Sequence, residues 1–154
     1  MQGDTGSFDL RRTLPLPPDR LWEVLTDPRD RESWGAPSEG TVLVMEAADV
    51  REGGQDRHRC GPAEAPEFVV NTRWYHLAAP ERAVFTETLV IEDMQIFTSL
   101  VTYRLEPAAG GTDLTVTVAL SSFTGPDALD EVRSGWTGGL ANLERHISTL
   151  TEEA

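Results

Sequence analysis

The sequence predicts an α+β protein in which an antiparallel sheet folds around one long helix at the end of the chain. Two periodicities indicate this fold class. Between residues 41 and 120, hydrophobic residues recur with the period of two that strands require, whereas over residues 126–150 they recur at three- and four-residue steps, as on a helix. A strand and two short helices come before the run of strands. A sheet folded around a helix in this way can enclose a pocket.

The first elements are recognised by alternation and by proline. Polar residues alternate with apolar ones in the first strand, although Arg12 falls on its apolar face. Pro18 suits the first turn of a helix, where its missing N–H has no partner to lose, and Pro28 ends that helix. In order, we expect a strand over residues 8–14, a helix from residue 18, a short helix over residues 29–33 and a loop over residues 34–37.

Further strands are expected as three hairpins, giving a sheet of six to seven strands. Gly and Pro mark the turns, at Gly53-Gly54, residues 78–81 and residues 107–111. For the strand over residues 68–77, the sequence does not decide which face points inward, because large side chains occur in both of its alternating sets. The expected strands cover residues 41–47, 57–61, 68–77, 82–90, 96–105 and 113–120.

The terminal helix presents one continuous apolar stripe to the sheet. The stripe consists of Leu129, Val132, Trp136, Leu140, Leu143, Ile147 and Leu150. Beside it stand Gly135, Gly138 and Gly139, each costing up to about 1 kcal/mol against alanine in a helix interior. We favour a structural reason for the glycines, either a close approach of the helix to the sheet or a bend in the helix. The alternative is that the glycines leave room for a ligand.

Composition limits the class of protein and its partners. A chain of 154 residues suits a single domain over residues 1–154. Its formal net charge of −13 disfavours phosphate backbones and anionic lipids, so no nucleic-acid or membrane partner is expected. The single cysteine cannot form an internal disulfide, and no secretory signal begins the chain, which favours the cytoplasm.

The sequence lacks the residues and motifs that several kinds of catalysis require. All 13 basic residues are arginine, which excludes Schiff-base lysines, and no Gly-x-Ser-x-Gly turn or nucleotide-binding glycine loop occurs. His58 and Cys60 share a strand face, but zinc needs three or four ligands and the other histidines are only His76 and His146. We therefore expect neither a metal nor a cofactor.

Six phrases in a fixed order carry a family resemblance. They lie at residues 14–22, 26–28, 34–37, 49–54, 79–87 and 111–115, and include Trp34-Gly35-Ala36-Pro37 and Gly111-Thr112-Asp113. Together they resemble the activator-of-heat-shock-ATPase homologue (AHSA-type) branch of the START-like, SRPBCC superfamily. The resemblance implies a helix-grip fold like that of START and Bet v proteins, with two short helices after the first strand and a cavity between sheet and helix. The branch has no catalytic motif to transfer.

Candidate site residues are those expected around that cavity. Aromatic walls with a few polar groups are typical of small-molecule cavities, although they also make cores. The ligand-binding candidates are Trp34, His58, Phe68, Trp74, Phe97, Tyr103, Trp136 and Leu140. Arg12 and Glu87 fall on inward faces, where a lone charge is costly. Each is either part of a structural ion pair or a polar anchor for a ligand, unless a shift in strand register places one of them outside. His58 and Glu87 are also candidate catalytic groups.

Three functions follow as alternatives. The first is a binding protein for a hydrophobic or aromatic small molecule. The second is a polyketide-cyclase-like or hydrolase-like enzyme that uses His58, His76, Glu87 or Tyr103 as acid and base in the same cavity. The third is a co-chaperone-like protein that contacts a chaperone and stimulates a heat-shock ATPase. A monomer or a homodimer is compatible with each.

Overall fold

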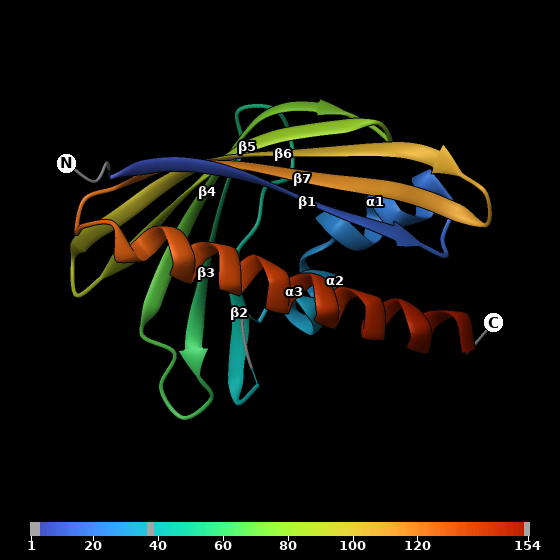
Figure 1. Cartoon of the computed structure of the whole chain (residues 1–154). Coiled ribbons are helices and arrows are strands. Elements are labelled where there is room, and N and C mark those ends of the chain that lie inside the picture. Colours follow the sequence, from blue (N-terminus) through green and yellow to red (C-terminus); the bar gives the residue numbers. More distant parts are fainter. Residues whose placement is uncertain (1–3, 37–38, 153–154) are drawn as a thin grey trace.

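One antiparallel sheet of seven strands curves around the helix α3, which runs along the hollow of the sheet (Figure 1). This computed structural model describes residues 4–36 and 39–152. The strand order is β1-β7-β6-β5-β4-β3-β2. The elements are β1 (Thr5–Leu14), α1 (Pro18–Thr26), α2 (Pro28–Trp34), β2 (Thr41–Ala47), β3 (Gln55–Pro62), β4 (Phe68–Ala78), β5 (Arg82–Ile91), β6 (Met94–Ala108), β7 (Gly111–Ser122) and α3 (Asp127–Glu152).

The expected helix-grip architecture is confirmed, and the sheet has seven strands. The observed strands extend the expected ones by up to three residues at an end. A further hairpin joins β5 to β6 through Glu92 and Asp93, which have φ values of 51° and 64°. Such positive φ values fit the tight turns that join antiparallel strands.

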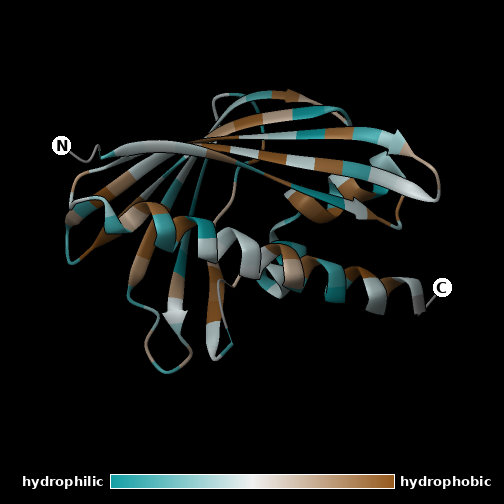
Figure 2. Ribbon diagram, viewed as in Figure 1, coloured by the Kyte–Doolittle hydropathy of each residue, from teal (hydrophilic) through white to brown (hydrophobic). Residues whose placement is uncertain are grey.

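Hydrophobic and hydrophilic residues alternate along β6 and β7 (Figure 2). Burial alternates along the same strands, so the sheet has a buried and a more exposed face. On β7 the buried face consists of Leu114, Val116, Val118 and Leu120. These side chains pack in the same core cluster as Leu140, Leu143 and Ile147 of α3. The helix stripe and the strand alternation therefore meet as their periods predict, because each element has one apolar face to cover.

A bulge in β4 settles the parity that the sequence leaves open. Trp74 points inward and is 1% exposed, whereas Tyr75 is 52% exposed. The pairing of β4 with β5 shifts register between Trp74 and His76. Because a bulge inserts one extra residue, large side chains on both parities are accommodated without burying both.

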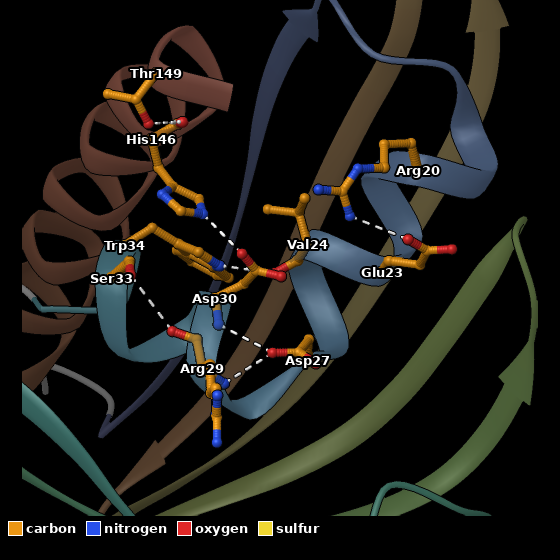
Figure 3. Close-up of polar contacts among 10 residues, drawn as sticks. All are labelled: Arg20, Glu23, Val24, Asp27, Arg29, Asp30, Ser33, Trp34, His146 and Thr149. Carbon is orange, nitrogen blue, oxygen red and sulfur yellow. Dashed lines mark hydrogen bonds and ion pairs between the residues drawn. The ribbon is translucent and has the colours of Figure 1, made fainter. Parts of the chain in front are cut away.

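Capping and side-chain hydrogen bonds hold α1 and α2 at one end of the sheet. The Asp27 carboxylate accepts hydrogen bonds from the backbone N–H groups of Arg29 and Asp30, at 2.9 and 3.1 Å, and so caps α2. The Trp34 indole N–H donates to the carbonyl of Val24 at 3.0 Å (Figure 3). These bonds fix the orientation of α2 relative to α1.

A contact between α2 and α3 ties the short helices to the long one. His146 Nε2 and Asp30 Oδ1 lie 2.8 Å apart in a half-buried position (Figure 3). The pair joins residues 116 positions apart in the chain.

None of the helices within the described ranges has the length and apolar character that crossing a bilayer demands.

Candidate functional site

A cavity of about 270 Å³ lies between the inner face of the sheet, α2 and α3. Strands β2 to β6 supply most of its wall, and α2 and α3 supply the rest. The lining residues are Arg31, Trp34 and Gly35; Leu43; His58 and Cys60; Phe68, Val70 and Trp74; Phe85, Glu87 and Leu89; Phe97 and Tyr103; and Glu131, Val132, Gly135, Trp136 and Gly139. The lining is thus largely aromatic and aliphatic, with a few polar groups.

An uninterrupted series of aromatic rings forms one wall of the cavity. Trp74 lies 4.8 Å from Phe85, Phe85 lies 5.1 Å from Tyr103, and Tyr103 lies 6.1 Å from Trp136, measured between ring centroids. The last two contacts are edge-to-face, an arrangement that aromatic pairs favour. The series spans β4, β5, β6 and α3, so it links the sheet to the helix across the cavity.

A buried ion pair fixes α2 to the sheet at one side of the cavity. Arg31 Nη1 donates to Asp56 Oδ2 at 2.7 Å, and the Trp74 indole N–H donates to the same oxygen at 3.0 Å. The backbone N–H of Asp49 donates to the other carboxylate oxygen at 2.6 Å. The Arg31 guanidinium also lies 5.6 Å from the centroid of the Trp74 ring. The positive charge on the cavity wall is therefore matched by Asp56.

Glu87 has no such partner. It lines the cavity from β5, and its carboxyl group makes no hydrogen bond or ion pair with any residue that the structure describes. Burial raises the pKa of Glu87, and the positive charge of Arg31 offsets part of that rise. The site therefore favours the uncharged carboxylic acid.

Three further groups on the cavity wall, His58, Cys60 and Tyr103, are held uncharged by burial. Burial lowers the pKa of His58 to about 3, with a further contribution from Arg31 and an opposing one from Asp56. Burial raises the pKa of Cys60 to about 11, and it also raises the pKa of Tyr103; the Glu87 carboxyl adds to both shifts. Neutral hydrogen-bonding groups thus face the cavity.

Two hydroxyl groups flank Glu87 on the neighbouring strands. Glu87 is directly opposite Thr72 of β4 and Ser99 of β6. Thr72 is 2% exposed and Ser99 1%, yet neither hydroxyl has a hydrogen-bond partner among the described residues. Sequence analysis missed both residues, and also Arg31. Their inward parity is readable for each strand, but which hydroxyl lies beside Glu87 depends on the cross-strand register.

The expectation of close helix-to-sheet packing is wrong for Gly139. Gly139 is buried on α3, but a Cβ atom built there would meet no atom within 4 Å. Gly139 and Gly135 both line the cavity. The missing side chain of Gly139 therefore leaves open space on the helix side.

Most of the expected site residues lie on the cavity lining. Those on it are Trp34, His58, Phe68, Trp74, Glu87, Phe97, Tyr103 and Trp136. Arg12 and Leu140 do not line it. Arg12 instead pairs with Glu144 of α3, with Nε and Oε1 3.2 Å apart, because its long side chain reaches past the core to the helix surface. Leu140 is buried in the hydrophobic core.

The histidines lie far apart in the fold. His76 lies near Glu52, with Nδ1 and Oε2 3.6 Å apart, and His146 contacts Asp30. Over residues 4–36 and 39–152, no three His, Cys, Asp or Glu side chains are grouped so that they could hold a metal ion.

A family model supplies the relationship to known proteins. The model described as "Activator of Hsp90 ATPase homolog 1-like protein" matches residues 15–148. The chain belongs to this family. Membership in the Hsp90-activator-like family agrees with the helix-grip fold and with the AHSA-type branch that the sequence phrases resemble. None of the curated protein sequences gives a significant match.

Solved structures similar to this member of the Hsp90-activator-like family share its fold. A protein from Rhizobium loti is 27% identical, with a TM-score of 0.80 over 92% of this chain and 96% of that one. An uncharacterized protein from Rhizobium leguminosarum is 20% identical, with a TM-score of 0.82 over 94% and 95%. An AHSA1-like protein from Aeromonas hydrophila is 20% identical, with a TM-score of 0.74 over 95% and 94%.

Proposed function

We propose that this protein binds a small hydrophobic or aromatic molecule in the cavity between the sheet and α3. The observation that carries the proposal is the cavity itself, because protein interiors normally leave few voids larger than a water molecule. Its lining supports the same function. Ligand cavities are concave and mostly apolar, with a small number of polar groups that orient the ligand.

The cavity volume limits the size of the ligand. An apolar cavity of about 150 Å³ admits benzene. The cavity of about 270 Å³ therefore suits a molecule with one or two rings. The rings of Trp74, Phe85, Tyr103 and Trp136 provide faces and edges against which such a molecule can stack.

Naphthalene is a suitable first probe, and the four tryptophans are internal reporters. In ¹H–¹⁵N spectra, naphthalene should shift the indole signals of Trp34, Trp74 and Trp136, which line the cavity. The signal of Trp22, which lines a separate surface hollow beside α1, should stay in place. Equal shifts at all four tryptophans, or no shift at any, would contradict the proposal.

A variant that fills the cavity provides the second test. Gly139→Leu places a side chain in the open space beside α3 and should abolish the naphthalene shifts. Thr137→Leu is the matched control, because it adds the same side chain at an exposed position on the same helix. Naphthalene binding that survives Gly139→Leu would place the ligand elsewhere.

A general acid–base enzyme is the second candidate, and the unpaired carboxyl group of Glu87 favours it. Strongly shifted titratable groups in cavities are often catalytic. Hydrolysis of 4-nitrophenyl acetate, measured against pH, tests this candidate. Turnover that is lost in Glu87→Gln but kept in Thr88→Val supports an enzyme, whereas turnover unchanged in Glu87→Gln removes Glu87 from the mechanism.

A co-chaperone function is the third candidate, and the family match supports it. In that case the outer surface, not the cavity, acts on the partner. The ATPase rate of a purified heat-shock ATPase should rise when this protein is added, and Gly139→Leu should leave that rise unchanged. An ATPase rate that does not respond would eliminate this candidate.

A further inference from the structure

Four polar side chains at or beside the cavity have hydrogen-bonding capacity that no described residue uses. The Glu87 carboxyl group is unpartnered, and so are His58 Nδ1, Thr72 Oγ1 and Ser99 Oγ. His58, Thr72 and Ser99 are at most 5% exposed. Leaving a buried polar group without a hydrogen bond is costly, so most native proteins have only a few such groups.

The sheet register brings three of these groups into one row. Thr72 of β4, Glu87 of β5 and Ser99 of β6 lie directly opposite one another on adjacent strands. The neighbouring rows on the same face are mostly apolar. One contains Trp74 and Phe85, and the other contains Leu89 with Phe97 and, on β3, His58. The polar row is thus a strip across a largely apolar wall.

Charge near the strip is already balanced without a ligand. Arg31 on the cavity wall is paired with Asp56 at 2.7 Å, so its charge is not left over for an anionic ligand. Within the described part of the chain, no arginine or histidine forms an ion pair with Glu87. Because an unpaired charge is expensive to bury, burial favours the uncharged form of the Glu87 carboxyl group between the two hydroxyls, and the His58 ring nearby is neutral.

We propose, building on the function proposed above, that the strip of Thr72, Glu87 and Ser99 orients an uncharged ring compound through its hydroxyl group. The rings lie against the aromatic wall. In the complex, the hydroxyl of the ligand exchanges hydrogen bonds with the Glu87 carboxyl group, and the Thr72 and Ser99 hydroxyls, unpartnered without the ligand, hold that carboxyl from either side. The strip therefore selects hydroxylated over unsubstituted and over charged ring compounds.

Four naphthalene derivatives of similar size test this selectivity by isothermal titration calorimetry. The probes are 2-naphthol, naphthalene, 2-naphthoate and 2-naphthylmethylammonium. We expect 2-naphthol to bind about tenfold more tightly than naphthalene, since one good hydrogen bond is worth about a factor of ten. The two ions should bind more weakly than 2-naphthol. Tightest binding by either ion overturns the inference.

The variants Glu87→Gln, Thr72→Val and Ser99→Ala separate ligand recognition from a structural role. If the strip serves a ligand, Thr72→Val and Ser99→Ala should each raise the melting temperature of the ligand-free protein by about 2–4 °C, because an orphaned hydroxyl is removed. All three variants should reduce the preference for 2-naphthol over naphthalene. A lowered melting temperature with unchanged 2-naphthol affinity would show that the strip is structural.

Thr88→Val is the matched control. Thr88 is next to Glu87 on the opposite face of β5, and its hydroxyl is hydrogen-bonded to that of Thr98 at 2.9 Å. Its replacement should not raise the melting temperature and should leave the selectivity unchanged. The two proposals fail in different ways. Equal affinity for 2-naphthol and naphthalene overturns only the role of the strip, whereas binding of none of the four probes overturns the proposed function and this inference together.

Discussion

Arg31 of α2 donates a hydrogen bond of 2.7 Å to Asp56 of β3, and both side chains are buried although they lie 25 positions apart. Asp56 also accepts from the indole N–H of Trp74 and the backbone N–H of Asp49. This one carboxylate therefore connects a helix, two strands and a loop at the edge of the cavity.

Asp56→Ala should lower the free energy of unfolding by about 3–5 kcal/mol, because it leaves the buried Arg31 charge unpaired. Urea denaturation measures the loss. As a control, Glu23→Gln breaks an exposed pair with Arg20 and should cost less than about 1 kcal/mol. The double variant Arg31→Met, Asp56→Leu should lose less than Asp56→Ala, since it buries no charge. Similar losses in all three proteins would rule out the ion pair as the cause.

Rising pH should destabilise the ligand-free protein through Glu87. Burial raises the pKa of this carboxyl group above its ordinary value of 4.5. The unfolded chain therefore releases the proton near pH 4.5, whereas the folded protein keeps it to higher pH. Because the folded state binds more protons in this window, the free energy of unfolding falls as pH rises through it.

The variant Glu87→Gln isolates this contribution. Its gain in stability over the unchanged protein, measured by urea denaturation from pH 4 to 8, should grow with pH and level off above the folded pKa. Cys60, Tyr103 and His58 line the same cavity as Glu87 but keep one charge state over this range, because burial holds them neutral. A gain that does not change with pH would mean that Glu87 is ionised in the folded protein.

Gly139→Ala should raise the free energy of unfolding by up to about 1 kcal/mol, because alanine favours the helix and its methyl group meets no atom within 4 Å. Thermal or urea denaturation measures the gain. Gly35→Ala is the opposite case, since its Cβ would lie 2.6 Å from the Arg31 carbonyl oxygen and from Leu43 Cδ1. That variant should be destabilised, and a loss at Gly139 as well would show that no open space exists there.

Cys60 should react slowly with iodoacetamide in the folded protein. Burial raises its pKa from 9.0 to about 11, so the reactive thiolate is about 100-fold rarer at pH 8 than in the unfolded chain. Mass spectrometry of the alkylated protein, with and without guanidinium, compares the two rates. Equal rates would show that the thiol is freely exposed, and naphthalene should slow the folded-state reaction further if it occupies the cavity.

Hydrophobic periodicity in the sequence was sufficient to predict the strands and α3. It also predicted which side chains face inward on most of these elements. Periodicity is a local property, and each apolar face has only one place to be buried. It also selected several aromatic residues that line the cavity, including Trp34 and Trp136, but it did not select Phe85, which lies between Trp74 and Tyr103 in the series of rings. Periodicity did not predict the position of the Arg12 guanidinium. A long side chain can start from an inward-facing position and still reach Glu144 outside the cavity.

The roles of individual polar groups required the tertiary structure. The bulge at Tyr75 decides which side of β4 faces the cavity, and the register of β4, β5 and β6 places Thr72 and Ser99 beside Glu87. Burial, not residue type, then decides the charge of His58 and Glu87. Such properties depend on atoms far apart in the chain, so local patterning specified the elements and their apolar faces, while three-dimensional packing decided where space and unpaired hydrogen-bonding groups remain.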